Sequence, residues 1–305
     1  MNEVCVRRPA MKLLPCFLTA LLLVSAVAGA QDFTVAYLEG EAQARSGTTW
    51  QDLAIGDKVP LEASVRVREL GLAQLKGNGI DIFLNQPGTY SLKEIVAARR
   101  QMSAPRVGAA LANSFSYMAK GPTQRQSMIA GSRGASQSRS EDLAWVETMA
   151  EVYLESGRTF VESGQYDKAV DQFNQALDAA DDIEVPEIRY NLANAYSLNG
   201  DLPEAWKQIA GIQPGPSAGW AGDFCLLKAK LLEDANAYTD ALLWLKQDTR
   251  DLSRDAQRAP VYYFLLALGY LGSGDQQNAH DAFSKVVALS RDSDVGQAAK
   301  SFLGN

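Results

Sequence analysis

The side chains that could carry out catalysis are few and scattered in this sequence. A hydrolytic triad needs a base beside its nucleophile, yet His280 is the only histidine in the 305 residues. It directly follows Ala279, at a position where the side chains of the predicted helix face solvent. The neighbouring carboxylates Asp181 and Asp182 fall in a predicted loop and form no recognisable acid and base pair. We therefore expect no enzyme activity and no small-molecule substrate.

Metal and cofactor sites lack their usual ligands as well. A zinc site needs several Cys or His ligands, and two of the three cysteines, Cys5 and Cys16, lie in a segment that we expect to be removed. The spaced series of Asp and Gly that forms a calcium loop is absent. The sequence predicts neither a metal nor a cofactor. Cys225, at an apolar position of a helical pattern, is expected to be a buried free thiol.

The first thirty residues have the order of a secretory signal peptide. Basic residues precede an apolar run over 13–27, which ends in the small residues of 28–30. A membrane-spanning helix is the alternative, but it would need about 20 apolar residues, and Pro15 shortens the usable run. We expect cleavage after Ala30 and export to the periplasm of a Gram-negative bacterium, where association with the outer membrane is also compatible with the sequence.

Charge divides the remaining chain into three parts. Residues 31–94 hold 6 basic and 9 acidic residues, residues 95–140 hold 7 basic and no acidic ones, and residues 141–305 hold 13 basic and 26 acidic. A basic connector between two acidic modules is therefore predicted. Nucleic acid is not an expected partner for an exported protein of this charge.

Short alternating stretches fill residues 31–94. Apolar and polar residues alternate with period two, as in Val65-Arg-Val-Arg68 and Ile80-Asp-Ile-Phe-Leu84, and turn residues such as Gly77-Asn-Gly79 separate the stretches. This pattern predicts β-strands. The first module is therefore expected to be a small all-β unit.

The order of features in this module resembles the FecR-type domain. The matching segments are Leu38-Glu-Gly40, Trp50-Gln-Asp-Leu53, Ile55-Gly-Asp57, Gly88-Thr-Tyr90 and a later Ala130-Gly-Ser-Arg-Gly-Ala135. The resemblance implies an envelope location and a β-module that contacts another protein or the cell wall. The best-known members relay an iron–siderophore signal across the inner membrane. That role needs a cytoplasmic segment before the span, and only ten residues precede Met11.

Trp50 has two interpretations in such a module. A tryptophan anchored in the core of the small sheet is the favoured one, because aromatic residues dominate core energetics. An exposed indole that stacks on a sugar ring is the alternative.

The basic connector, residues 95–140, is rich in Ser, Gln, Arg, Gly and Ala, a composition that buries little apolar surface. After Pro105, however, Val107, Leu111, Phe115 and Met118 recur at spacings of three or four. This spacing predicts a short amphipathic helix that docks on either module. The basic residues either attract an anionic envelope surface or form a solvated linker held by the acidic repeats.

Self-similarity is strongest from residue 141 to the end. Small and aromatic residues recur with the spacing of a tetratricopeptide repeat, and the predicted turns follow one another by 36, 36 and 38 positions, at Gly164, Gly200, Asn236 and Gly274. The repeat of that family is roughly 34 residues long. Small residues let antiparallel helices approach, and larger ones fill the space between repeats. The resemblance predicts an α-solenoid of about four repeats, closed by an end helix from Val295 to Leu303.

In tetratricopeptide repeats, the first helix of each repeat lines a concave groove. Carried over by position, the resemblance assigns this partner-binding groove to Leu154, Arg158, Tyr190, Asn194, Leu226, Lys230, Phe264 and Leu268. Chaperone-binding members clamp a terminal carboxylate with basic residues, but Leu154 stands at a clamp-lysine position. An apolar or basic peptide segment is therefore the expected ligand. Phe264 and Leu268 either line the apolar end of the groove or pack beneath the end helix.

Together these features predict a multidomain, non-enzymatic adaptor of the cell envelope. Its β-module would contact one component, and its repeat groove would recruit another envelope protein or a peptide segment. The alternative is a protein whose β-module binds cell wall (peptidoglycan) or another polysaccharide while the repeats only aid assembly. A regulator descended from the iron-signalling family is a third possibility, and it would need an intact cytoplasmic segment upstream.

Overall fold

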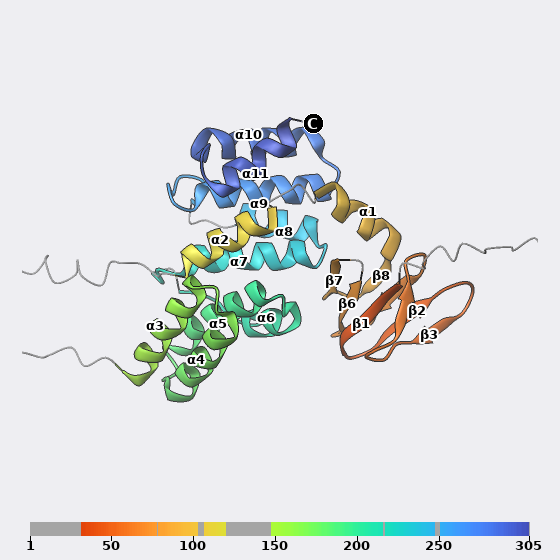
Figure 1. Cartoon of the computed structure of the whole chain (residues 1–305), viewed down its shortest axis with the longest axis horizontal. Helices are drawn as coiled ribbons and strands as arrows, with labels where there is room; N and C mark the ends of the chain where they lie inside the picture. Colours follow the sequence, from red (N-terminus) through yellow and green to blue (C-terminus); the bar gives the residue numbers. More distant parts are fainter. Residues whose placement is uncertain are drawn as a thin grey trace, which may run out of the picture. The chain divides into compact units, whose positions relative to one another are not determined.

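The computed structural model describes residues 32–77, 79–102, 107–119, 148–215, 217–247 and 251–304. The predicted signal peptide and most of the basic connector, including the Ala130–Ala135 segment, lie outside these ranges. Within them, an all-β module is followed by a helical region (Figure 1). None of the helices in this part of the chain is both long and apolar enough to cross a membrane.

In the described residues, eight short strands form two four-stranded sheets in which every neighbouring pair is antiparallel. The strand order is β4-β1-β6-β7 in one sheet and β3-β2-β5-β8 in the other. The strands are β1 (Asp32–Glu39), β2 (Ala42–Arg45), β3 (Trp50–Asp52), β4 (Lys58–Pro60), β5 (Ser64–Val67), β6 (Leu72–Gly77), β7 (Ile80–Leu84) and β8 (Gly88–Ser91). The predicted all-β module is confirmed.

The core of this module follows the alternation of the sequence. Phe33 and Val35 are buried on either side of the exposed Thr34, and Val65 and Val67 are buried likewise. Successive side chains of a strand point to opposite faces, so each sheet presents one apolar face. These faces share one cluster of buried residues.

Trp50 is not a core residue, and the favoured interpretation of its role is wrong. Its side chain is only partly buried and lies outside the apolar cluster of the module. The guanidinium carbons of Arg45 and Arg66 lie 4.8 and 4.1 Å from the centroid of its ring. These are cation–π distances, so the indole is held at the surface by one cation from the neighbouring strand β2 and one from β5.

In the described part of the segment between the β-module and the repeats there are two helices. Helix α1 (Leu92–Met102) was not predicted, and the expected boundary between residues 94 and 95 falls inside it. Its buried Leu92, Ile95 and Val96 extend the core of the β-module. Helix α2 (Val107–Met118) occupies the segment in which the apolar spacing predicts a helix, and it buries Ala110, Leu111, Phe115 and Met118.

The remaining helices are arranged as successive antiparallel pairs, each pair contacting the next. The pairs are α3 (Met149–Glu162) with α4 (Tyr166–Ala179), α5 (Val185–Asn199) with α6 (Leu202–Ile209), α7 (Ala221–Asp234) with α8 (Tyr238–Gln247), and α9 (Ala259–Gly272) with α10 (Gln276–Ser290). Helix α11 (Asp294–Leu303) packs on the last pair (Figure 1). A tetratricopeptide-like solenoid is the fold of this region.

The turn inside each pair has the conformation that its residue predicts. Gly164, Gly200 and Gly274 have φ angles of 71°, 83° and 86°, and Asn236 has 61°. Glycine adopts positive φ without steric cost, and asparagine tolerates it better than most other residues. The third repeat, which has asparagine at its turn, therefore turns in the same way as the others.

Close approach within the first pair depends on the absence of a side chain. A Cβ added to Gly157 on α3 would lie 2.4 Å from the Phe173 ring on α4. Both residues are buried. The aromatic ring thus fills the space that glycine leaves, as the repeat pattern predicts.

The β-module contacts the turns and second helices of the middle repeats. Gln74 Nε2 donates to Gly200 O at 3.3 Å, and Arg99 Nε on α1 donates to Asn236 Oδ1 at 3.1 Å. Gln86 Nε2 donates to Asp240 Oδ2 at 2.7 Å. Two left-handed turns therefore hold the β-module: one through the carbonyl oxygen of Gly200 and one through the side chain of Asn236. The two modules are joined by more than a linker.

We predict that Gly157→Ala destabilises the protein although alanine favours helices by up to about 1 kcal/mol over glycine. The added methyl group collides with Phe173, and overpacking of this kind costs roughly 1–3 kcal/mol. Urea unfolding followed by circular dichroism measures the change. Combining Gly157→Ala with Phe173→Leu should recover part of the loss, whereas a stabilising Gly157→Ala would contradict this packing.

Candidate partner-binding groove

The eight predicted groove residues lie on the first helices of the four pairs, as assigned. Leu154 and Arg158 are on α3, Tyr190 and Asn194 on α5, Leu226 and Lys230 on α7, and Phe264 and Leu268 on α9. Seven of them are buried, and Lys230 is partly buried. Tyr190, Leu226, Phe264 and Leu268 belong to one apolar cluster. Leu154 belongs to a second cluster. The structure therefore brings half of the predicted set together in one cluster, and not as an open surface.

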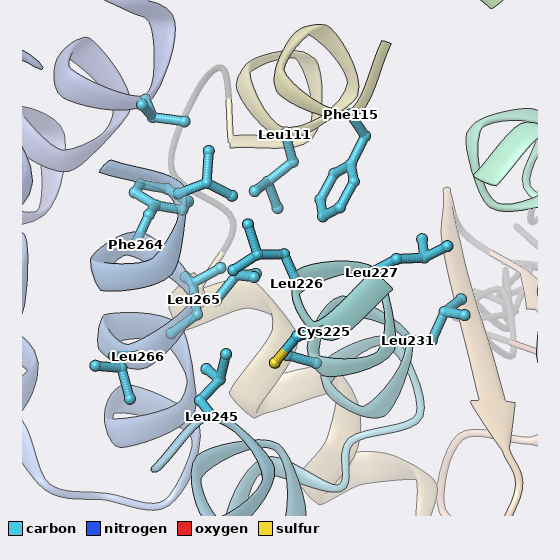
Figure 2. Packing of buried hydrophobic residues seen from close by; sticks show 14 of the residues in the cluster. Leu111, Phe115, Cys225, Leu226, Leu227, Leu231, Leu245, Phe264, Leu265 and Leu266 are labelled. Atoms are coloured by element: carbon cyan, nitrogen blue, oxygen red, sulfur yellow. The ribbon is translucent and has the colours of Figure 1, made fainter. Parts of the chain in front are cut away.

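Helix α2 packs against several of these residues. It contacts α3, α5 and α11, and its buried Leu111, Phe115 and Met118 belong to the same cluster as the groove residues. Figure 2 shows Leu111 and Phe115 extending from α2 toward Leu226 and Leu227 on α7. The concave side of the array is thus filled by a segment of the same chain.

Polar contacts fix α2 in this position. Asn194 Nδ2 donates to the carbonyl oxygen of Phe115 at 3.0 Å, and this bond is buried. The same carbonyl also accepts from the backbone N–H of Ala119 at 3.2 Å, so Asn194 is a second donor to the last turn of α2. On the other side of α2, Asn113 Nδ2 donates to Asp294 Oδ2 on α11 at 2.7 Å. The array therefore holds α2 through its backbone as well as its apolar side chains.

The two cations of the predicted groove are engaged with carboxylates of the array. Arg158 donates from Nη1 to Glu155 Oε1 and from Nη2 to Glu187 Oε1, each at 2.6 Å. Lys230 Nζ lies 2.6 Å from Asp234 Oδ2. A partner carboxylate would have to displace these internal pairs. Arg158 and Lys230 are thus not available to bind the terminal carboxylate of a partner peptide.

An aromatic group that sequence reasoning missed supports the floor of the groove. The ring of Tyr190 stacks on Trp220, with centroids 5.5 Å apart, and Phe224 meets both rings edge-on. Trp220 precedes α7, beyond a loop whose length hid its spacing relative to the repeats. Stacked and edge-on pairs of this kind add stability beyond burial. Burial raises the pKa of the Tyr190 hydroxyl well above its ordinary value.

Lys228 stands where the repeat pattern usually has an apolar residue. Its Nζ lies 3.8 Å from the centroid of the Trp244 ring on α8. The indole Nε1 donates in turn to Cys225 O at 3.0 Å. A cation–π contact lets a lysine serve at this position, and partial burial lowers its pKa.

Glu233 borders a cavity of about 540 Å³ beside the first turn of α2. The residue is 6% exposed, and its Oε1 has no hydrogen-bond partner among the described residues. Burial raises the pKa of Glu233 well above its ordinary value, and the neighbouring Asp234 raises it further, while Lys230 and Arg99 oppose the shift. The neutral form of Glu233 therefore persists to a higher pH than that of an exposed carboxyl.

Comparison with known families supports the assignment of the first repeat. Residues 150–183 match the family model of the tetratricopeptide repeat. The matched range covers α4 and all of α3 except its first residue. No match to a FecR-type family is found, and no curated protein matches the chain. The repeat match indicates a role in protein–protein interaction.

We predict that Glu233→Gln flattens the pH dependence of stability. The pKa of Glu233 is raised in the folded protein above its ordinary value of about 4.5. The contribution of this residue to stability is therefore greatest below about pH 4.5, where Glu233 is protonated in both the folded and the unfolded states. That contribution is lost as the pH rises from there toward the pKa of the folded state, because the unfolded chain ionises first. The variant and the parent should therefore melt close together near pH 4, and the variant should become the more stable one as pH rises.

Thermal melting between pH 4 and pH 8 measures this difference. Glu94→Gln, which removes an exposed carboxylate of α1, is the matched control and should leave the profile unchanged. Parallel curves for Glu233→Gln and the parent would show that Glu233 ionises normally in the folded protein.

Proposed function

We propose that this protein is an exported, non-enzymatic adaptor of the cell envelope that binds a helical segment of a partner protein through its repeat array. The observation that carries the proposal is the concave side of the array, which accommodates an apolar helix, α2, over the first helices of the repeats. Helix-in-groove recognition is a recurrent mode of protein binding. A surface shaped to hold one such helix is suited to hold another.

The proposed location rests on the sequence. Residues 1–30 have the order of a signal peptide, and the β-module resembles an envelope domain. The basic connector, residues 95–140, provides positive charge for an anionic envelope surface. In this proposal the compartment is the periplasm, and the partners are envelope proteins or their peptide segments. The β-module is the second attachment point, held to the array by Gln74, Gln86 and Arg99.

Binding of the cell wall or a polysaccharide through the β-module is the second candidate function. The surface position of Trp50, with Arg45 and Arg66 against its ring, favours it. The same outer face of the sheet carries Gln43 and Asp52, which are hydrogen-bonded to each other at 2.8 Å. Polar side chains beside an aromatic ring are groups that a glycan with anionic substituents would contact.

Site-specific photocrosslinking in cells separates the two functions. A crosslinking amino acid at Tyr117, which is 53% exposed on α2, is expected to capture an envelope protein. The same group at Asp178, exposed on the second helix of the first pair, is the control and should capture less. Capture of wall fragments at Trp50, with no protein captured at Tyr117, would favour the glycan-binding function and contradict the adaptor.

Export makes a separate prediction about the mature protein. The protein recovered from the envelope fraction should begin at Gln31, because the small residues before it suit a signal peptidase. N-terminal sequencing checks this. A protein that retains residues 1–30 in the cell would contradict cleaved export, while leaving the helix-binding surface of the array untested by that experiment.

A further inference from the structure

Helix α2 lies outside the repeat pattern of the array. Each of the four helix pairs is complete without it, and solenoid repeats normally contact only their neighbours. Helix α2 instead contacts the first pair, the second pair and the end helix α11. It therefore has the contacts that a ligand of the concave side would have, although the chain itself supplies it.

The surface beneath α2 keeps hydrogen-bonding capacity that α2 does not use. Asn194 Oδ1 and Tyr190 Oη are buried and have no hydrogen-bond partner among the described residues. Both residues are at most 2% exposed. Leaving a buried polar atom unpaired is costly, and a site built only for α2 would gain by having apolar side chains there. These atoms indicate that the concave side also receives a ligand with polar groups at these positions.

The fit of α2 is incomplete at its other side too. A cavity of about 230 Å³ remains between the last turns of α2 and helices α9 and α11, bordered by Ser114, Met118, Val261 and Val295. At the start of α2, the exposed Gly108 borders the larger cavity of about 540 Å³ and has no atom within 4 Å of the place where a Cβ would stand. A helix with larger side chains at such places would make more contact than α2 does.

We propose that α2 is a built-in occupant of the groove, and that a partner helix displaces it in order to bind. The inference rests on the proposed adaptor function. The partner helix carries an uncharged face with large apolar residues four positions apart, as Leu111 and Phe115 are, and with polar groups that reach Asn194 Oδ1 and Tyr190 Oη. Acidic residues on that face are disfavoured, because Glu155 and Glu187 already engage the buried arginine of the groove. Only molecules from which α2 has left the groove can bind the partner. The apparent affinity is therefore the affinity of the empty groove multiplied by the fraction of such molecules.

The test uses the full chain and a fluorescent peptide with the sequence of residues 107–118 as the probe. Phe115→Ala in the chain removes a fully buried side chain of α2 and should raise the affinity for the peptide at least tenfold over the parent in fluorescence anisotropy. Ala109→Ser, on the exposed side of α2, is the matched control and should bind as the parent does. A peptide with Ser in place of its Leu and Phe should not bind.

A second variant, expected to weaken peptide binding instead of strengthening it, keeps the test independent of any loss of folding. Gly108→Ala favours the helix without a steric clash, so it should strengthen α2 in its place and weaken peptide binding several-fold. Circular dichroism checks that the array stays folded in each variant. Equal peptide affinity for the parent, Phe115→Ala and Gly108→Ala would overturn the proposal.

Two further outcomes are informative. A parent chain that forms a dimer in analytical ultracentrifugation, which Phe115→Ala abolishes, would overturn the intramolecular assignment, because α2 would then occupy a second copy. Peptide binding that follows the expected order, together with no envelope protein captured from cells, would support the exchange of α2 and contradict only the proposed cellular role.

Discussion

The contact between the apolar face of α2 and the first helices of the repeats determines what the concave side of this protein presents. Leu111 and Phe115 reach the same buried cluster as Leu226 and Phe264, so α2 and the array share one core. Burying a large apolar side chain is worth about 1.5–3 kcal/mol. The stability of the helix and the accessibility of the groove are therefore coupled, since anything that exposes the groove must also remove α2 from this core.

The repeats could be predicted because each depends on local features that the sequence displays. A residue that tolerates positive φ marks each turn, as Gly200 and Asn236 do, and a small residue such as Gly157 stands opposite a large one such as Phe173. The amphipathic spacing of α2 was equally visible. Its docking surface was not, because a pattern of apolar residues defines the face that will be buried and says nothing about what buries it.

The errors and omissions in the sequence interpretation have the same physical origin. Trp50 lies at the surface because Arg45 and Arg66, from other strands, contact its ring. Arg158 is unavailable to a ligand because Glu187, on the next repeat, pairs with it. Each outcome depends on a partner distant in sequence, and no spacing rule reports such a pair. Helix α1 was missed because its apolar residues complete the core of the β-module instead of forming a repeat.

Cys225 is fully buried in the cluster that joins α2, α7 and α9 (Figure 2). If residues 1–30 are removed, it is the one cysteine that the sequence retains. Thiolates react only when reagents reach them, so alkylation of this sulfur requires the core around it to open. The rate at which this native thiol is labelled therefore reports how often the core at the centre of the solenoid opens. No probe has to be introduced for this measurement.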